Sequence, residues 1–122
     1  MIKIILVVDD SRLSRMMISA IIKEYDNQWT ILEAPSADEA VKQCEQHTVT
    51  AITLDMNMPG KSGLEIAPKL KEMQPSAHIA LLTANVQKSV KAEAESLGLS
   101  FISKPVTEDK VIRYIKAVEE SL

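Results

Sequence analysis

The chain has 122 residues, of which 46% are hydrophobic and 25% are charged, and its formal net charge is −3 at pH 7. This length predicts one compact domain, residues 1–122. An acidic balance without clustered basic residues argues against a nucleic-acid-binding face. No apolar stretch reaches the roughly 18 to 20 residues of a membrane span, and the N-terminal run lacks the cleavage site of a signal peptide. Together with the single Cys44, which fits a reducing compartment, these features predict a cytoplasmic protein.

Strand and helix patterns alternate along the chain. The strand patterns are short, largely apolar runs, and they cover residues 2–8, 28–34, 49–54, 78–82 and 99–103. The helical patterns repeat apolar residues three and four positions apart, and they cover residues 11–25, 36–46, about 62–73, 85–97 and the segment after Thr107. Such alternation predicts an α/β fold in which parallel strands are joined by right-handed helical crossovers.

Particular residues mark where these helices begin, end or bend. Ser36 precedes Glu39 by three positions, which is the spacing of a capping box. Gly98 stands where a left-handed C-cap is expected. Pro68 removes a helical hydrogen bond, so we expect either a kink there or a helix that begins only near Pro68. The helix over residues 11–25 is expected to turn one apolar stripe toward the core, and the members of that stripe are Leu13, Met16, Met17, Ala20 and Ile21.

Three acidic residues follow two of the predicted strands. Asp9 and Asp10 close the first strand, and Asp55 closes the third. If these strands are parallel neighbours, the three carboxylates meet at one edge of the sheet. Like charges this close raise one another's pKa unless a cation or a proton intervenes. Because carboxylate oxygens suit a hard divalent ion, the pattern predicts a magnesium site that could also receive a phosphate.

The remaining strand ends carry groups that complement phosphate. Thr83 follows the fourth strand and Lys104 the fifth. Each has an ordinary alternative, since Thr83 could cap a helix and Lys104 could be a solvated charge. A ligand in a doubly wound sheet binds at the carboxyl ends of the strands, where a hydroxyl and an ammonium group can hold phosphoryl oxygens. The combination predicts a metal-assisted phosphate site.

Four motifs occur in an order and spacing that match one family. They are Val7-Val8-Asp9-Asp10-Ser11, Leu54-Asp55-Met56-Asn57-Met58-Pro59-Gly60, Leu82-Thr83-Ala84 and Ser103-Lys104-Pro105. Over essentially the whole chain they resemble the receiver domain of bacterial two-component response regulators, in particular single-domain chemotaxis regulators. The resemblance implies a flavodoxin-like fold, with a five-stranded parallel sheet in the order 2-1-3-4-5 and five helices. It also implies that residues 1–122 form one receiver domain.

The resemblance implies a role for each acidic residue. Asp55 would accept a phosphoryl group from a phosphohistidine or a small phosphodonor. Asp10 would bind Mg²⁺ directly, and Asp9 would act mainly through a metal-bound water. Asp55 and the backbone carbonyl of Asn57 would complete the protein ligands, and Mn²⁺ could take the place of Mg²⁺. No organic cofactor is implied.

The resemblance further implies a phosphorylation-dependent switch. Lys104 and Thr83 would each contact a phosphoryl oxygen, and Lys104-Pro105 matches the position of the family's cis peptide. When the phosphate draws Thr83 inward, the aromatic ring of Phe101 would move into the vacated space. A plain core aromatic fits Phe101 equally well. The responding surface would be residues 85–97, 99–103 and 106–122, whose mixed charges fit a protein partner better than DNA.

The partners implied are a sensor histidine kinase or a histidine phosphotransfer protein upstream, and an unknown protein target downstream. No direct contact with nucleic acid or membrane is implied, and the chain would be a monomer or a phosphorylation-dependent dimer. Such a domain is not an enzyme, since it catalyses only its own phosphorylation and dephosphorylation. The uncharged amides of Asn57 and Asn85 would let the phosphorylated state decay unaided. Met1 and the helix ending near residue 120 favour a natural single-domain regulator, and a fragment of a longer chain stays possible.

Three other functions stay open from the residues alone. A flavodoxin-like electron carrier would need a hydroxyl-rich phosphate loop after the first strand, which the sequence lacks. A phosphohydrolase with an aspartate nucleophile would normally carry a second acid where Asn57 stands. A phosphorylation-independent scaffold would have no need of the acidic, threonine and lysine set.

Overall fold

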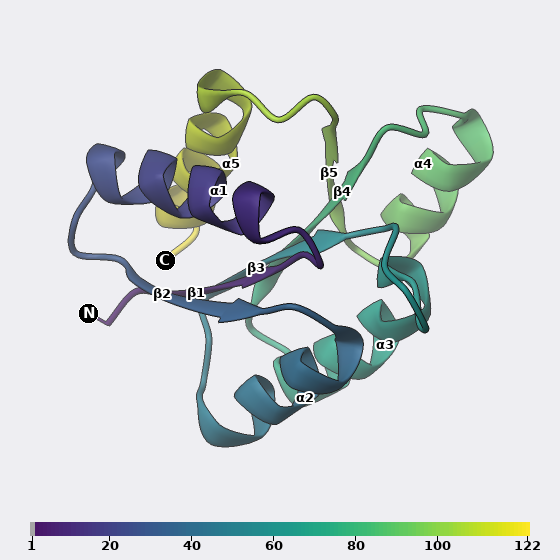
Figure 1. Ribbon diagram of the computed structural model, residues 1–122, viewed down its shortest axis with the longest axis horizontal. Helices are drawn as coiled ribbons and strands as arrows, with labels where there is room; N and C mark the ends of the chain where they lie inside the picture. The colour runs from purple at the N-terminus through teal and green to yellow at the C-terminus, as the bar shows by residue number, and fades with distance from the viewer. Residues whose placement is uncertain (1) are drawn as a thin grey trace.

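The computed structural model describes residues 2–122, which fold into five strands and five helices (Figure 1). The strands are β1 (Ile4–Val8), β2 (Thr30–Ala34), β3 (Ala51–Asp55), β4 (His78–Thr83) and β5 (Ser100–Ser103). The helices are α1 (Arg12–Tyr25), α2 (Ala37–Gln46), α3 (Gly63–Met73), α4 (Lys88–Ser96) and α5 (Glu108–Glu120). The predicted alternation of strand and helix is therefore confirmed. Within residues 2–122, none of the helices has the length and apolar character needed to cross a membrane.

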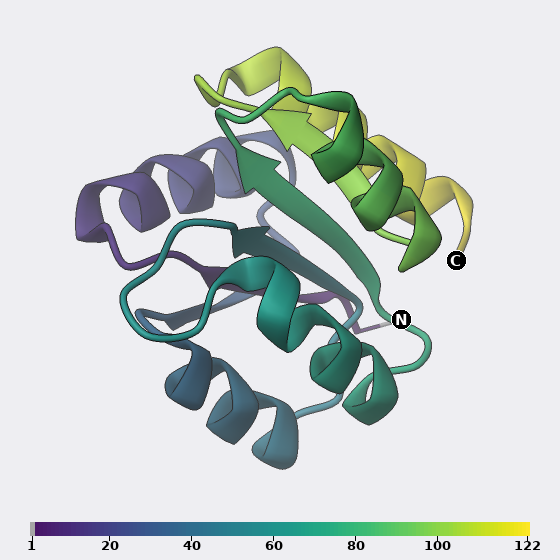
Figure 2. The same ribbon diagram turned by 90° about the vertical axis from the view of Figure 1, so that its right-hand side faces the viewer.

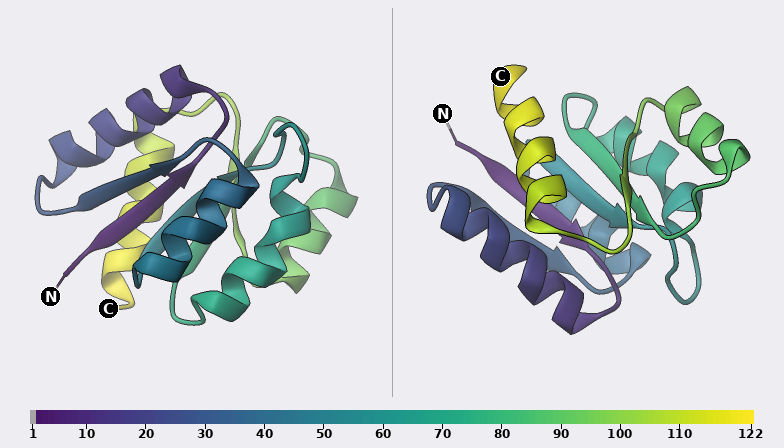
Figure 3. Two further views of the ribbon diagram at one scale, coloured as in Figure 1. Left: turned by 60° about the horizontal axis from the view of Figure 1, so that its bottom comes forward. Right: turned by 90° about the horizontal axis from the view of Figure 1, so that it is seen from above.

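All five strands are parallel and form one sheet in the order β2-β1-β3-β4-β5, as predicted (Figure 2). The register pairs Val8 of β1 with Ala34 of β2 and with Leu54 of β3. It also pairs Asp55 with Leu82 of β4. Because every strand runs in the same direction, all their carboxyl ends lie at one edge of the sheet. The two chain ends lie at the opposite edge (Figure 3).

Helices cover both faces of the sheet and enclose a core on each side. Helices α1 and α5 lie on one face, and α2 and α3 lie on the other (Figures 1 and 3). Helix α4 adds Val90 and Ala94 to the core on the side of α2 and α3. The central strand β1 feeds both cores, since Ile5 and Val7 belong to one and Leu6 and Val8 to the other. This explains why the sequence of β1 is a continuous apolar run, β-branched except at Leu6, and not an alternating pattern.

The predicted orientation of α1 is wrong for all five residues of the predicted stripe except Ile21. Leu13, Met16 and Met17 face outward, with exposed fractions of 77%, 55% and 41%, and Ala20 is exposed as well. The buried residues of this helix are instead Ile18 and Ile22. These two lie three and seven positions after Arg15, whose side chain is only 13% exposed because it bonds to the end of β1. Since Arg15, Ile18 and Ile22 share one helical face, most of the predicted stripe faces away from the sheet, and only its member Ile21 packs partly buried against the core.

Two helix starts also differ from expectation. Helix α4 begins at Lys88, three residues later than predicted, and the backbone N–H of Gln87 donates to Oδ1 of Asn85 (3.0 Å) in the turn that precedes the helix. Helix α3 begins at Gly63, so the alternative of a start near Pro68 is wrong. A capping box between Ser62 and Glu65 fixes that start, and the helix continues through Pro68.

The predicted caps of the other helices are largely present. Ser36 accepts the N–H of Glu39 at 3.2 Å, which is one half of the predicted capping box. Gly98 has a φ of +74°, so it adopts the left-handed conformation predicted for it.

Candidate functional site

The sheet ladder holds the strand-end residues in place. The N–H of Asp9 donates to the carbonyl of Ala34 at 3.1 Å, so the residue after β1 is still attached to β2. In the same way, the N–H of Lys104 donates to the carbonyl of Thr83 at 2.9 Å. Each functional side chain is therefore carried by backbone that belongs to the rigid sheet or lies directly beside it.

The structure brings the three predicted acidic residues together. One carboxylate oxygen from each of Asp9, Asp10 and Asp55 lies within 4.8 Å of the others. Asp9 and Asp55 are buried, each 2% exposed, whereas Asp10 is exposed to solvent. A buried pair of anions beside a third, accessible one attracts a small cation from solution.

Asp9 provides a direct test of whether a metal ion fits this site. Burial, more than any other cause, raises the pKa of Asp9; the N–H of Ser11 opposes this effect, and the nearby carboxylate of Asp55 adds to it. The Ser11 N–H occupies Oδ1 at 2.9 Å. Oδ2 is buried and has no hydrogen-bond partner among residues 2–122. A buried carboxylate oxygen left unpaired is unfavourable, so a magnesium ion or one of its waters fits this position.

The predicted basic group also reaches the site. Nζ of Lys104 lies 2.8 Å from Oδ1 of Asp55, and the Asp55 side chain is only 3% exposed whereas that of Lys104 is 32% exposed. The peptide bond between Lys104 and Pro105 is cis, as the motif implied. The ammonium group therefore neutralises part of the acidic cluster from the β5 side.

Thr83 lies at the end of β4 and is fully buried. Its Oγ1 accepts the N–H of Asn85 at 3.0 Å. Since the hydroxyl is an acceptor in this bond, its own proton is left to donate. A buried donor at a strand end beside the acidic cluster suits an incoming anionic oxygen.

Phe101 and Asn57 are placed less tightly than the acidic residues. Phe101 is partly buried against the core on the α4 side, and Nζ of Lys91 lies 5.4 Å from the centre of its ring. This packing agrees with the plain core-aromatic interpretation, and the switch role stays a prediction. Asn57 is exposed in the loop after Asp55, and the role of its carbonyl as a metal ligand also stays a prediction.

The sequence interpretation missed two residues that support the site. A Cβ at Gly63 would lie 2.5 Å from the carbonyl oxygen of Asp55, so only glycine allows α3 to approach the end of β3 this closely. Arg15 donates from Nη1 to the carbonyl oxygen of Asp9 at 2.6 Å. The glycine-containing loop before α3 was a faint signal for the first contact. Arg15 carried no signal, because it lies outside the apolar stripe predicted for α1.

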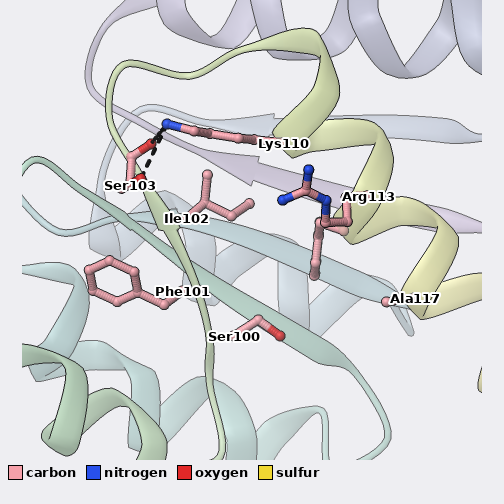
Figure 4. A pocket seen from close by; sticks show the side chains of 8 residues that line it. Ser100, Phe101, Ile102, Ser103, Lys110, Arg113 and Ala117 are labelled. Atoms are coloured by element: carbon pink, nitrogen blue, oxygen red, sulfur yellow. Dashed lines mark hydrogen bonds between the residues drawn. The ribbon is translucent and has the colours of Figure 1, made fainter. Parts of the chain in front are cut away.

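A groove of about 270 Å³ lies apart from the acidic cluster, between β5 and α5 (Figure 4). Its wall combines apolar side chains such as Ile102 with the basic side chains of Lys110 and Arg113. Lys110 bonds to the carbonyl of Ser103 at 2.9 Å, and the Phe101 ring points to the other side of β5. The groove lies within the surface that the sequence predicted to respond to phosphorylation.

Comparison with known proteins agrees with this geometry. Residues 5–116 match the family model described as the response regulator receiver domain. The chemotaxis protein CheY of Listeria monocytogenes is 33% identical over 113 residues, which are 92% of this chain and 94% of that protein. The response regulator UvrY of Escherichia coli K12 is 30% identical over 93% of this chain and 53% of its own length. The structure of chemotaxis protein CheY4 of Vibrio cholerae shares the fold, with a TM-score of 0.87 at 22% identity over 97% of this chain and 99% of that one.

An acidic cluster at the carboxyl edge of a 2-1-3-4-5 parallel sheet, with a lysine bonded to the central aspartate, defines the receiver class of signalling domain. The chain belongs to the response regulator receiver domain family. Its similarity to chemotaxis regulators extends over nearly their full length, so it is a receiver of the CheY type and acts in two-component signalling.

Proposed function

We propose that residues 1–122 form one phosphoacceptor domain in which Asp55 is phosphorylated in a magnesium-dependent reaction. The observation that carries this proposal is the convergence of Asp9, Asp10 and Asp55 within 4.8 Å, with Lys104 bonded to Asp55 at 2.8 Å. The acceptor is buried and paired, whereas Asp10 remains open to solvent. Asp55 would thus be the acceptor, Lys104 would neutralise part of its charge, and a cation could approach from the solvent beside Asp10.

The chemistry is a single displacement at phosphorus. A carboxylate oxygen of Asp55 attacks the phosphorus of a phosphohistidine, and the new P–O bond forms as the P–N bond breaks. The electron pair of the broken bond leaves with the imidazole ring, which takes up a proton from water. With acetyl phosphate as the donor, a P–O bond breaks and acetate leaves. The product in either case is an aspartyl phosphate at residue 55.

The metal would be held by side chains that the structure has already brought together. Asp10, which is exposed, would be the direct ligand, and the unpartnered Oδ2 of Asp9 would contact a metal-bound water. Asp55 and the Asn57 carbonyl would complete the protein ligands. When bound, Mg²⁺ supplies positive charge that neutralises phosphoryl oxygens in the transition state. Mn²⁺ has the same preference for carboxylate oxygen and would substitute for it.

Lys104 and Thr83 would hold the phosphoryl group from the side of β4 and β5. Lys104 already contacts Asp55 and would turn to a phosphoryl oxygen once the acyl phosphate has formed. Thr83 would donate its hydroxyl proton to a second phosphoryl oxygen. A shift of Thr83 would open space toward Phe101, whose movement would change the surface around β5 and α5.

The upstream partner is proposed to be a sensor histidine kinase or a histidine phosphotransfer protein. Outward-facing Leu13, Met16 and Met17 on α1 support a protein donor, because an exposed apolar patch beside a reactive site marks an interaction surface. The downstream partner is proposed to be a protein, and not nucleic acid, that binds the groove between β5 and α5. The proposed location is the cytoplasm, where the kinase would be accessible and where reducing conditions would keep Cys44 as a free thiol.

Two alternatives from the sequence are less well supported by the site. A phosphohydrolase would need an acid two residues beyond Asp55, where an exposed Asn57 stands. A phosphorylation-independent scaffold gives no use for a buried, unpaired oxygen on Asp9. The domain is therefore proposed to catalyse only its own phosphorylation and dephosphorylation.

Intact-mass measurement tests the proposal. The wild type and Asp55→Asn would be incubated with acetyl phosphate, with MgCl₂ or with EDTA. We expect a gain of one phosphoryl group only in the wild type, and only when MgCl₂ is present. If the wild type gained no phosphoryl group under conditions that label another receiver, the proposal would be contradicted. Continuous release of phosphate from a phosphate ester would favour the phosphohydrolase.

A further inference from the structure

We propose that Arg15, held in place by Glu33, positions the acidic metal ligands after β1. This inference rests on the proposed function, because it concerns the same magnesium site. It assigns a positioning role to a residue of α1 that contacts neither the metal nor the phosphate. Its effect would pass through the backbone of Asp9 and Asp10.

The contacts that carry the inference connect three elements. Nη1 of Arg15 donates to the backbone carbonyl oxygen of Asp9 at 2.6 Å. Nε of the same guanidinium donates to Oε1 of Glu33 at 3.0 Å. Glu33 lies in β2 opposite Val7 of β1. One planar group on α1 is thus fixed by β2 while it holds the end of β1.

The carbonyl of Asp9 belongs to the peptide unit that joins Asp9 to Asp10. Fixing this oxygen fixes the plane of that peptide, and therefore the direction in which the Asp10 side chain leaves the backbone. The N–H of Asp9 is bonded to Ala34, and its Oδ1 is bonded to the N–H of Ser11. The Arg15 contact completes the set of bonds that orients Asp9, and within residues 2–122 no other hydrogen bond holds the peptide that leads on to Asp10.

The pairing with Glu33 explains how the positively charged Arg15 can lie beside a proposed magnesium site. A bare guanidinium near three carboxylates would compete with Mg²⁺ for them. The Glu33 carboxylate balances the charge of Arg15, and the bond to Nε turns the guanidinium toward the Asp9 carbonyl. The side chain of Arg15 is only 13% exposed, so this orientation is enclosed by its neighbours.

A positioning role and simple charge repulsion predict opposite effects on magnesium affinity when Arg15 is removed. If Arg15 acted only through its charge, its removal would strengthen magnesium binding. If it orients the ligands, its removal weakens binding, and groups that orient metal ligands typically change affinity about 10- to 100-fold. Arg12 offers a matched control, because it lies in the same helix, is exposed, and makes no hydrogen bond or ion pair within residues 2–122.

The experiment is an amide NMR titration of the full chain with MgCl₂ for the wild type, Arg15→Ala, Arg15→Lys and Arg12→Ala. The spectra show whether each variant is folded and give the dissociation constant for Mg²⁺. We expect the constant to rise about tenfold in Arg15→Ala and severalfold in Arg15→Lys, which keeps the charge but cannot make both bonds at once. In Arg12→Ala, we expect it to stay the same or fall slightly.

Phosphorylation by acetyl phosphate separates positioning from a general loss of structure. The Mg²⁺ concentration that gives half the maximal rate should rise in Arg15→Ala, whereas the rate at saturating Mg²⁺ should return close to that of the wild type. A folded Arg15→Ala with unchanged or tighter magnesium binding would overturn the inference and leave the proposed function intact. A wild type that bound no magnesium would overturn both.

Discussion

Nζ of Lys104 lies 2.8 Å from Oδ1 of Asp55, although the two residues are 49 positions apart. The bond joins the loop after β5 to the end of β3 across the intervening strand β4. It places a positive charge on the proposed acceptor before any phosphate arrives. The same charge lies near the place where a magnesium ion would bind, so Lys104 should favour phosphoryl transfer and oppose metal binding.

Lys104→Met should therefore separate these two effects. We expect Mg²⁺ to bind severalfold more tightly, because a neighbouring cation is gone. We expect phosphorylation by acetyl phosphate at saturating Mg²⁺ to fall on the order of 100-fold, because a donor to the phosphoryl oxygens is lost. NMR titration and intact-mass kinetics measure the two quantities. Lys61→Met, which removes an exposed charge, is the control, and an undiminished rate in Lys104→Met would exclude the assigned role.

Asp9→Asn should remove most of the effect of magnesium on stability. The carboxylate of Asp9 is 2% exposed and has one oxygen without a partner in residues 2–122, so its charge destabilises the metal-free protein. We expect the variant to be more stable than the wild type without metal, by on the order of 1 kcal/mol. Added Mg²⁺ should stabilise the wild type and have little effect on the variant.

Urea unfolding with MgCl₂ and with EDTA measures both quantities. The prediction is wrong if Asp9→Asn lowers the free energy of unfolding in EDTA, or if Mg²⁺ stabilises both proteins equally.

Gly63→Ala should disturb the acceptor without touching it directly. The new Cβ would lie 2.5 Å from the carbonyl oxygen of Asp55 and 3.1 Å from Cδ1 of Leu81. Backbone cannot rotate away as a flexible side chain can, so we expect a loss of about 1–3 kcal/mol of unfolding free energy. Phosphorylation should slow as well, since the end of β3 must move.

Pro68→Ala on the same helix is the matched control for Gly63→Ala. Pro68 is exposed, and alanine restores the backbone N–H that proline lacks, so this variant should lose no stability. Equal stability of Gly63→Ala and the wild type would show that α3 does not approach β3 as closely as described.

Lys3→Met should make the stability less dependent on pH. Nζ of Lys3 lies 2.5 Å from Oδ2 of Asp26 and 2.8 Å from Oε2 of Glu119. The bond from Lys3 lowers the pKa of Asp26. The resulting stabilisation is complete above the ordinary Asp26 pKa of 3.8 and is lost as the pH falls through the lower folded value. The pKa of Lys3 is raised, chiefly by the bond to Asp26, so its contribution is complete below 10.5 and is lost at higher pH.

We therefore expect Lys3→Met to be less stable than the wild type at neutral pH and to lose less stability upon acidification below about pH 4. Urea unfolding over this range measures the difference. Lys116→Met removes an exposed lysine of α5 and serves as the control. A wild type and a Lys3→Met variant with parallel pH profiles would rule out the ion pair as the cause.

Much of the fold was predictable because parallel βαβ architecture leaves a strong imprint on the sequence. A strand buried on both faces, such as β1, is largely apolar, and the site residues stand at the ends of such strands or directly after them. Asp9, Asp55 and Lys104 could be placed at one edge because the ends of parallel strands coincide. The order and spacing of the four strand-end motifs then matched a single family.

The errors arose where an outcome depends on tertiary contacts. Helical periodicity does not reveal which of two apolar stripes on α1 faces the sheet, and in the structure Ile18 and Ile22 are buried while Arg15 on the same face bonds to Asp9. The segment before α4 is a turn in which the side chain of Asn85 accepts the N–H of Gln87, and the helical pattern of residues 85–97 does not report this local bond. The close approach of Gly63 to Asp55 involves two backbones, and sequence patterns do not report such a distance.

The most direct measurement locates the phosphoryl group. The protein would be phosphorylated with acetyl phosphate and Mg²⁺ and then reduced with borohydride, which converts an aspartyl phosphate to homoserine, before peptide mapping by mass spectrometry. We predict homoserine at residue 55 alone, and none when EDTA replaces Mg²⁺. Homoserine at Asp9 or Asp10, or a phosphoryl group that is not converted at residue 55, would contradict the assignment of Asp55 as the acceptor.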